Sequence, residues 1–209
     1  MLCSSLFKGE TRACPVLDTG RGMGLLLERT VRSENAPHNY SVRFRDRISE
    51  MNEEKDLKTR IVRMEVSDLD TVVEMDASSR PTPWSKESFL KELQNPLSSC
   101  FTLKLKKEAT EQVIGFICFR ILGEESELLD LVIHSRYRRK GFGKHLMSFY
   151  SDFCHERKIK SFYLETGVSN GPAIRLYQSL AYQPIGKRPR FYHGREDALL
   201  MMRRACELE

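Results

Sequence analysis

Residues 138–143 have the sequence Arg-Arg-Lys-Gly-Phe-Gly, and this stretch decides the fold. It follows the apolar run Leu128–Ile133 and precedes apolar residues at helical spacing, which predicts a strand, a glycine-rich turn and a helix. The glycines let the backbone approach a ligand, and the unpaired N–H groups of the helix start attract negative charge. We therefore expect an anion such as a pyrophosphate here, although ordinary surface turns also combine glycine with basic residues.

The glycine spacing differs from the common nucleotide-binding motifs. The chain has no Gly-x-Gly-x-x-Gly here and no Gly-Lys-Ser/Thr, which argues against a dinucleotide fold or an NTPase loop. Residues 138–143 instead resemble the Arg/Gln-x-x-Gly-x-Gly/Ala motif of the GCN5-related N-acetyltransferase (GNAT) superfamily, which binds the pyrophosphate of acetyl coenzyme A. Downstream, Leu164–Leu180 resembles the Leu-Glu-Val-x-x-x-Asn-x-x-Ala-x-x-Leu-Tyr-x-x-Leu signature of the same superfamily.

Two further matches narrow the resemblance to enzymes that acetylate protein N-termini. Residues 194–201 are similar to their Gly-x-Glu-Asp-Ala-x-x-Met ending, especially in the bacterial ribosomal-protein-alanine N-acetyltransferases. Residues 83–85 match the Pro-Trp-Ser of those enzymes. The resemblance covers roughly residues 59–204, and the first fifty or so residues lie outside it.

The resemblance implies an α/β fold. It is a mixed, mostly antiparallel sheet of six or seven strands, splayed at the centre and flanked by about four helices, with coenzyme A in the splay. The periodicity of the chain agrees with such an alternation. Strands are expected over 59–66, 101–106, 113–121, 128–134, 161–166, 183–191 and 198–203. Helices are expected from a Ser67–Asp70 capping box to 76, over 86–94 after an N-cap at Ser85, and over 141–157 and 172–179.

The chain is predicted to be one domain with extensions. Residues 1–58 have no sustained period and form an N-terminal extension that we expect to be disordered. The acetyltransferase domain then covers 59–204, and 205–209 form a tail. Met51 leads directly into the first expected strand, which suggests the hypothesis that it is the natural start.

Composition excludes several classes. The 209 residues are 40% hydrophobic, with a net charge of +5, and no apolar stretch is long enough to cross a bilayer. The basic residues are dispersed, so we expect no direct nucleic-acid binding and no membrane partner. The six cysteines show no Cys-x-x-Cys spacing, which predicts reduced thiols, a cytoplasmic protein and no metal. The protein is expected to be a monomer or a weak dimer.

Two residues are candidates for proton transfer. Glu165, at the carboxyl end of its strand, matches the general base of the ribosomal-protein enzymes, although a solvated strand-end glutamate would look the same. Tyr177 lies in the following helix, and its phenol is a competent proton donor to a departing thiolate. Tyr177 could equally belong to an apolar helix face with Leu176 and Leu180, and a buried ring with a working hydroxyl would satisfy both interpretations.

The cofactor-binding residues follow from the resemblance. Backbone N–H groups around the end of the strand would stabilise the oxyanion, and Asn170 matches a position near the pantetheine arm, although Asn-Gly-Pro is also an ordinary helix cap. The full candidate set is Leu131, Val132, Ile133, Arg138, Arg139, Lys140, Gly141, Phe142, Gly143, Lys144 and Asn170.

Acceptor selection is expected to involve Trp84 and Tyr192. Trp84 could instead be a core anchor. The function implied is transfer of an acetyl group from acetyl-CoA to the N-terminal α-amine of a protein, namely a small-subunit ribosomal protein. Two alternatives remain: an acetyltransferase for lysine side chains, polyamines or another small amine, and a coenzyme A-binding module without turnover.

The chain departs from the superfamily pattern in three places. Ala181 and Tyr182 replace the usual Gly-Phe, so we expect the preceding helix to lack its left-handed final residue and to end differently. His134 and Ser135 replace the common Asp-Pro, and only one residue, at position 193, separates Tyr192 from Gly194. These departures affect the acceptor more than acetyl transfer itself.

Overall fold

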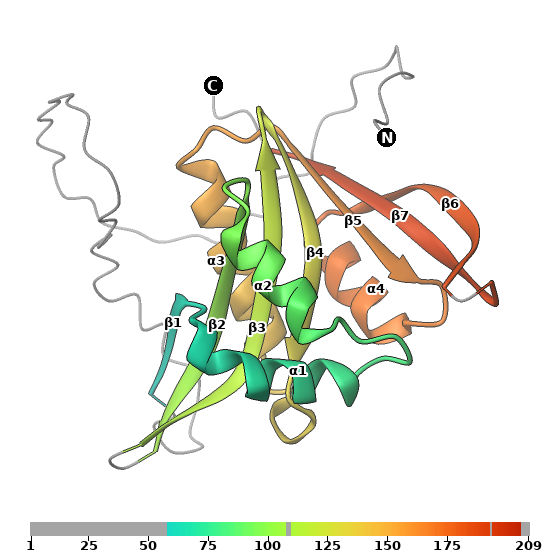
Figure 1. The fold of residues 1–209 in the computed structure, drawn as a ribbon. Helices are drawn as coiled ribbons and strands as arrows, with labels where there is room; N and C mark the ends of the chain where they lie inside the picture. The colour runs from blue at the N-terminus through green and yellow to red at the C-terminus, as the bar shows by residue number, and fades with distance from the viewer. Residues whose placement is uncertain (1–57, 108–109, 193, 206–209) are drawn as a thin grey trace, which may run out of the picture. The chain divides into compact units, whose positions relative to one another are not determined.

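A computed structural model describes residues 58–107, 110–192 and 194–205, and these form one seven-stranded sheet in the order β1-β2-β3-β4-β5-β7-β6 (Figure 1). All neighbouring strands are antiparallel except β4 and β5, which are parallel. The predicted mixed α/β sheet is therefore confirmed. The strands are β1 (Thr59–Arg63), β2 (Ser98–Lys107), β3 (Thr110–Leu122), β4 (Glu125–Ile133), β5 (Ser161–Gly167), β6 (Gln183–Tyr192) and β7 (Glu196–Arg204).

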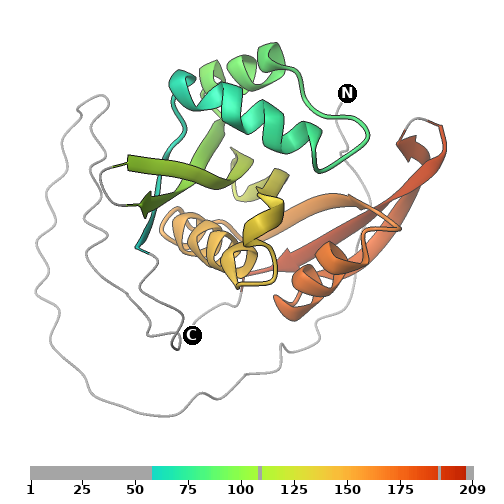
Figure 2. The ribbon, with the colours of Figure 1, turned by 90° about the horizontal axis from the view of Figure 1, so that it is seen from below.

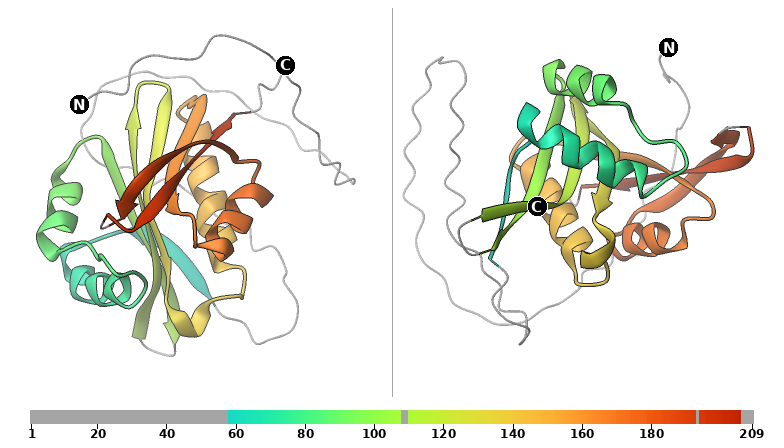
Figure 3. Two further views of the ribbon diagram at one scale, coloured as in Figure 1. Left: turned by 90° about the vertical axis from the view of Figure 1, so that its right-hand side faces the viewer. Right: turned by 60° about the horizontal axis from the view of Figure 1, so that its bottom comes forward.

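Two helices cover each face of the sheet, as seen from below in Figure 2 and in both views of Figure 3. Helices α1 and α2 pack on one face, and α3 and α4 pack on the other. The described helices are α1 (Leu69–Ala77), α2 (Lys86–Gln94), α3 (Phe142–His155) and α4 (Gly171–Ser179), with short 3-10 turns η1 (Val66–Asp68) and η2 (Ser135–Tyr137).

The sheet opens between its two parallel strands. β4 and β5 pair only over their first four positions, ending at Leu128 opposite Leu164. Beyond that point β4 continues along β3 as far as Ile133, while β5 follows β7 as far as Gly167. A register shift against β3 inserts Leu129 as an extra residue at the same place, and such a bulge bends its strand. The facing backbone groups of the two strands are thus left outside the sheet ladder.

The hydrophobic core lies on both faces. On the α3 side, the rings of Phe119, Tyr150 and Phe162 are fully buried against one another, with centroid separations of 4.6 and 5.7 Å along this series. On the α1–α2 side, Phe89 packs edge-on against Phe116, with 5.5 Å between ring centroids. Both cores end near the opening of the sheet, so its walls are held by well-packed residues.

Two local predictions differ in outcome. Ser85 caps α2 as predicted, because its hydroxyl accepts the N–H of Ser88 at 3.2 Å. The capping box predicted at Ser67 is wrong. The turn begins earlier, at η1, where the backbone N–H of Glu65 donates to Asp68 at 3.1 Å. Asp68 is drawn inward because it also pairs with Lys104 of β2 at 2.7 Å.

The prediction for the end of α4 is also wrong. Ala181 adopts the left-handed conformation, with φ of 65°, despite its side chain. Its N–H donates to the carbonyl of Gln178 at 3.1 Å, and the next N–H, of Tyr182, donates to Tyr177 at 3.0 Å. This is the Schellman pattern, which glycine usually completes. The ring of Tyr182 is fully buried, and its packing is what holds the strained turn.

Strand β6 forms one outer edge of the sheet. Its residues are exposed apart from Tyr192, and it contains two prolines, Pro184 and Pro189, which edge strands tolerate. No helix among the described residues is long and apolar enough to cross a membrane. The predictions for the extension 1–58, for Met51 as the start and for the tail 205–209 fall almost entirely outside the described residues.

Candidate active site

The floor of the candidate site is the end of β4. Val132 and Ile133 are buried and Leu131 is partly buried, so all three predicted oxyanion residues lie where β4 has parted from β5. Their side chains belong to the two cores, with Ile133 facing α3 and Val132 facing α1 and α2. The backbone groups on the β5 side are consequently the parts of these residues that a ligand in the opening would meet.

The glycine-rich turn follows this strand, as predicted. Arg139 and Gly141 both have positive φ, of 64° and 84°, and Gly141 is the N-cap of α3. The first N–H groups of α3, at Phe142, Gly143 and Lys144, have no carbonyl partner within the helix. Gly143 faces α4, where a Cβ would meet the side chain of Leu176 at 3.4 Å, an ordinary van der Waals contact.

The basic residues of the turn divide into two groups. Arg139, Lys140 and Lys144 are exposed at the start of α3, where they add positive charge to the helix dipole. Arg138 instead folds back. Its Nε donates to the carbonyl of Ile133 at 2.9 Å and its Nη2 to the hydroxyl of Ser79 at 3.0 Å. In this structure Arg138 fixes the turn itself.

Asn170 lies at the start of α4 and acts as its N-cap. Its side-chain oxygen accepts the N–H of Ala173 at 3.3 Å. The same turn is tied to β7, because Glu196 accepts the N–H and the hydroxyl of Ser169 at 2.9 and 2.6 Å. The capping interpretation of Asn170 is thus confirmed, and its contact with a cofactor stays a prediction.

Glu165 is partly buried on β5, beyond the last residue paired with β4. Its carboxylate accepts a hydrogen bond from Nη1 of Arg188 on β6 at 2.8 Å. The guanidinium of Arg188 in turn lies over the ring of Phe191, 4.3 Å from its centroid. Burial raises the pKa of Tyr192, and the negative charge of Glu165 raises it further, which places the two side chains within electrostatic reach.

Tyr177 lies on α4 with 7% of its surface exposed and its ring 6.0 Å from that of Tyr182. It belongs to the α3-side core, as the apolar-face interpretation predicted. Burial raises the pKa of its phenol, and the charge of Asp130 on β4 adds to the shift. Within the described part of the chain no hydrogen bond is formed by its hydroxyl. The phenol is therefore protonated across the neutral range and available to donate.

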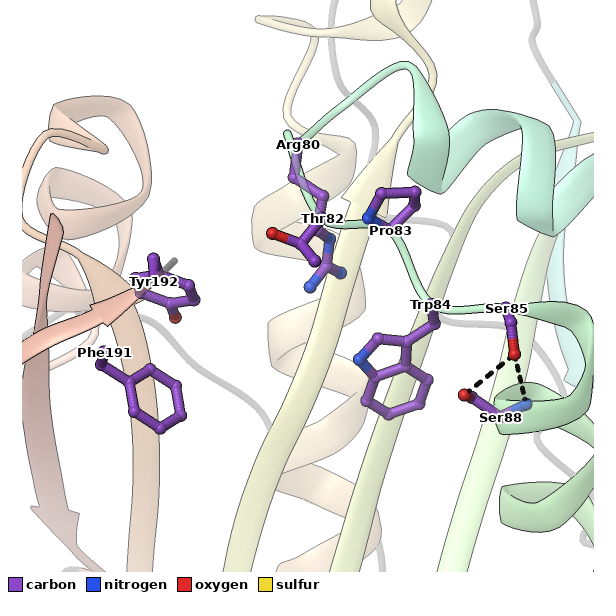
Figure 4. A pocket seen from close by; sticks show the side chains of 8 residues that line it. All are labelled: Arg80, Thr82, Pro83, Trp84, Ser85, Ser88, Phe191 and Tyr192. Atoms are coloured by element: carbon purple, nitrogen blue, oxygen red, sulfur yellow. Dashed lines mark hydrogen bonds between the residues drawn. The ribbon is translucent and has the colours of Figure 1, made fainter. Parts of the chain in front are cut away.

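A pocket of about 540 Å³ lies beside the opening (Figure 4). The segment between α1 and α2 and the first turn of α2 form one wall, and the end of β6 forms the other. Trp84 and Tyr192 face each other across it, so the two predicted acceptor residues are brought together. The lining residues are Arg80, Thr82, Pro83, Trp84, Ser85, Ser88, Phe191 and Tyr192.

Trp84 packs against the core, as one of its two interpretations predicted, and its contact with an acceptor stays a prediction. Its ring packs against Phe89 with 5.2 Å between centroids, which anchors it to the core. Trp84 also lines the pocket. Phe191 lines the opposite wall, next to Tyr192, but was not singled out as a site residue from the sequence.

A buried charge cluster was missed by the sequence analysis. Arg80 contacts two buried carboxylates, Asp76 of α1 and Asp130 of β4. Burial raises the pKa of Asp130 to about 7, and the negative charge of Asp76 adds to the rise, while the positive charge of Arg80 opposes it. The sequence did contain one sign of this cluster, a single aspartate inside the otherwise apolar run of residues 128–133. A charged residue in such a run is rarely buried without a partner of opposite charge.

The site and fold can now be compared with known proteins. The acetyltransferase (GNAT) family matches residues 69–182, which is more than half of the chain. The chain belongs to this family. It is accordingly an N-acetyltransferase, and the family and enzyme class predicted from the sequence are confirmed.

Two curated relatives carry the same name. A putative [ribosomal protein bS18]-alanine N-acetyltransferase of Bacillus subtilis is 32% identical over 146 residues, covering 69% of this chain and 94% of the relative. The [ribosomal protein bS18]-alanine N-acetyltransferase of Escherichia coli K12 is 26% identical over 141 residues, covering 66% and 92%. The family-level similarity thus extends over almost the whole length of both relatives.

Solved structures support the fold. The crystal structure of the ribosomal-protein-S18-alanine N-acetyltransferase from Escherichia coli superposes with a TM-score of 0.63 at 25% identity, covering 73% of this chain and 99% of that one. Ard1 from Thermoplasma volcanium gives 0.66 at 23% identity, covering 71% and 99%, and shows the fold alone. The roles of individual residues stay predictions.

Proposed function

We propose that this N-acetyltransferase transfers the acetyl group of acetyl-CoA to the N-terminal α-amine of a protein, and that the acceptor is a small-subunit ribosomal protein. The pocket between Trp84 and Tyr192, adjoining the opening of the sheet, is the observation that carries this proposal. It offers space for the first residues of a peptide, and its lining residue Phe191 stacks with Arg188, the hydrogen-bond partner of Glu165. Two bacterial relatives are alanine N-acetyltransferases of ribosomal protein bS18 by name, which suggests the acceptor class.

The donor is held by main chain and dipole. In this proposal the N–H groups at the start of α3 bind the diphosphate of acetyl-CoA, with Arg139, Lys140 and Lys144 adding positive charge. The backbone groups of Leu131–Ile133 that face the β5 side, where β4 no longer pairs with β5, hold the carbonyl region of the thioester in the opening. Such a site is formed by backbone geometry and needs few side-chain contacts.

The reaction then needs two proton transfers. The amine nitrogen attacks the thioester carbonyl carbon, and the carbon–sulfur bond breaks after the tetrahedral stage. Glu165 takes the proton that the amine loses, either directly or through a water, and Tyr177 gives a proton to the departing sulfur. Since Glu165 is paired with Arg188 at 2.8 Å, that ion pair must loosen as the amine arrives. Both substrates are bound at once, so the transfer is direct.

The lining of the pocket favours a peptide over a polyamine. Among the described residues that line it none is acidic, and its one charged member is Arg80. A polyamine carries several positive charges and needs carboxylates in its site, whereas a peptide backbone can use the hydroxyls of Thr82 and Ser85 between aromatic walls. An α-amine also has a lower reference pKa than a lysine side chain, so more of it is neutral at pH 7.

The proposal is tested with labelled acetyl-CoA and three kinds of acceptor. The first is a lysine-containing peptide with a free N-terminal alanine, the second is the same peptide with its N-terminus blocked, and the third is spermidine. Mass spectrometry locates the label. We expect label on the α-amine of the free peptides, and on a small-subunit protein when ribosomal extract is used. Preferential labelling of lysine or spermidine would favour the small-amine alternative, and acetyl-CoA binding without any transfer would favour the binding module.

We also propose that the protein is cytoplasmic, because ribosomal proteins are made and assembled in the cytoplasm.

A further inference from the structure

The segment between α1 and α2 is held at both ends by one buried carboxylate. Asp76 is fully buried near the end of α1. Its Oδ1 accepts a hydrogen bond from Nε of Arg80 at 2.5 Å, and its Oδ2 accepts the backbone N–H of Trp84 at 2.7 Å. The chain from residue 80 to residue 84 is thereby closed into a loop around Asp76. Both Arg80 and Trp84 line the acceptor pocket.

The same arginine connects this loop to the sheet. The guanidinium of Arg80 contacts Asp130 of β4 as well as Asp76 of α1. Asp130 follows Leu129, the bulged residue at which β4 separates from β5. One planar guanidinium can serve two carboxylates in fixed directions, whereas a lysine ammonium is a point charge on a flexible stem. Arg80 therefore fixes the loop with respect to the opening of the sheet.

A second arginine ties the neighbouring residue to the glycine-rich turn. Arg138 bonds the carbonyl of Ile133 and the hydroxyl of Ser79 at the same time. Ser79 precedes Arg80 in the chain. The start of the loop is thus attached to the end of β4 through two different guanidinium groups, and only Arg80 also reaches into the pocket.

We propose that Arg80 is a positioning residue for the acceptor: by bridging Asp76 and Asp130 it fixes the loop carrying Trp84 against the end of β4, and so sets the separation of Trp84 and Tyr192. This rests on the proposed function of the pocket as the acceptor site. Arg80 acts through the wall that it holds, and the reacting atoms are left to Glu165 and Tyr177.

The test needs variants that remove the bridge without leaving buried charges unpaired. Arg80→Ala alone would leave two buried carboxylates without their cation, a change that often unfolds a protein. A triple variant, Arg80→Met with Asp76→Asn and Asp130→Asn, removes all three charges at similar volume. Arg80→Lys keeps the charge but loses the planar bridge.

A matched control removes another ion pair near the same loop, between α1 and α2. Lys86 and Asp70 are paired at 2.5 Å, but both are largely exposed and neither lines the pocket. Lys86→Met with Asp70→Asn is expected to behave as wild type, since exposed pairs contribute little. Circular dichroism and thermal melting confirm that each variant is folded.

Trp84 gives a readout that does not depend on acetyl transfer. It is the single tryptophan of the full chain, so the intrinsic fluorescence reports on this loop alone. We expect acrylamide to quench Trp84 more strongly in the folded triple variant and in Arg80→Lys than in wild type and control. In steady-state kinetics the Michaelis constant for an alanine-starting peptide should rise about tenfold or more, while that for acetyl-CoA stays nearly constant.

Two outcomes would overturn the proposal. One is unchanged quenching in a folded triple variant, and the other is an equal rise in both Michaelis constants. If the wild-type protein acetylated no peptide at all, the proposed function would fail instead, and the quenching comparison would still decide whether Arg80 fixes the loop.

Discussion

The carboxylate of Glu165 accepts a hydrogen bond from Arg188, so a test of Glu165 as the proposed base should keep this hydrogen bond. Glu165→Gln keeps the size of the side chain and its hydrogen bond to Arg188 but removes the ability to take a proton. We expect kcat to fall by about 10²- to 10⁴-fold with little change in the Michaelis constant for acetyl-CoA, as general-base catalysis typically contributes. Steady-state kinetics with an alanine-starting peptide measures both values.

A suitable control is Glu124→Gln. Glu124 pairs with Lys160 at 2.7 Å near the opposite end of β4, and both side chains are more than half exposed. Its kinetics should match wild type. Equal rates for Glu165→Gln and wild type would show that proton removal is not the task of this residue.

Tyr177 supports a second test. Since its hydroxyl makes no hydrogen bond within the described residues and its ring lies in the core, Tyr177→Phe should preserve the fold while lowering kcat about 100-fold or more. Turnover and thermal melting are measured on the same sample. Tyr182→Phe is the matched control, because that ring is also buried and only 6.0 Å away. A similar loss in both variants would point to packing and not to proton donation.

At the level of single residues, the sequence pointed to candidate site residues but not to the side chains that contact them. Glu165, Trp84 and Tyr192 could be named because they match family motifs. The partner of Glu165, Arg188, could not be named, since the contact depends on how β6 curves after a break in its register. The same holds for Arg80, whose two carboxylates come from different elements.

At the level of elements, helix ends show where local sequence was misleading. Ala181 after α4 and Lys158 after α3 both have positive φ, of 65° and 58°, at positions where glycine is usual. The backbone after α3 forms the same pair of bonds, from Lys158 to His155 and from Ile159 to Cys154. Tertiary packing therefore determines where these two helices end, even though neither has a glycine at the left-handed position.

This gives a stability prediction for α4. Ala181→Gly relieves a left-handed conformation that costs an L-residue about 1 kcal/mol, so we expect a higher melting temperature by about 2–4 °C. Lys158→Gly should act in the same direction. Ala173→Gly, within the helix, should instead destabilise the protein by a similar amount. If Ala181→Gly melted lower than wild type, the entropy that glycine adds to the unfolded chain would outweigh the relief of strain.

At the level of the whole molecule, Asp130 links stability to pH. Burial raises its pKa from an ordinary 3.8 to about 7 in the folded protein. The folded state thus holds this proton more tightly than the unfolded state does, and the resulting stability is fully present below about pH 4 and is lost as the pH rises through 7. Asp130→Asn lacks this ionisation. The free energy of unfolding of wild type relative to this variant should fall between pH 4 and pH 7.

Denaturant unfolding of both proteins across that range measures the difference. Glu124→Gln serves again as a control for exposed carboxylates. If the difference in the free energy of unfolding between wild type and Asp130→Asn stayed constant over this range, Asp130 would be ionised throughout. Arg80 and Asp130 would then form an ordinary salt bridge.

The fold as a whole was more predictable than its opening. Hydrophobic periodicity, caps and turn residues are local signals, and together they located all seven described strands and all four described helices within a few residues. The separation of β4 from β5 after Leu128 depends on pairings between distant segments and on a bulge at Leu129, which no local pattern reveals. The resemblance to the superfamily supplied that feature, and the structure gives its physical cause.

The prolines of β6 have a consequence for the protein in concentrated solution. Pro184 and Pro189 have no backbone N–H and so cannot donate a hydrogen bond to an added strand. The exposed Lys187 also repels a second copy of the same strand. These features disfavour fibril growth by edge addition along β6, the strand whose end lines the pocket. Assays at high enzyme concentration should consequently not lose activity through self-association at this border.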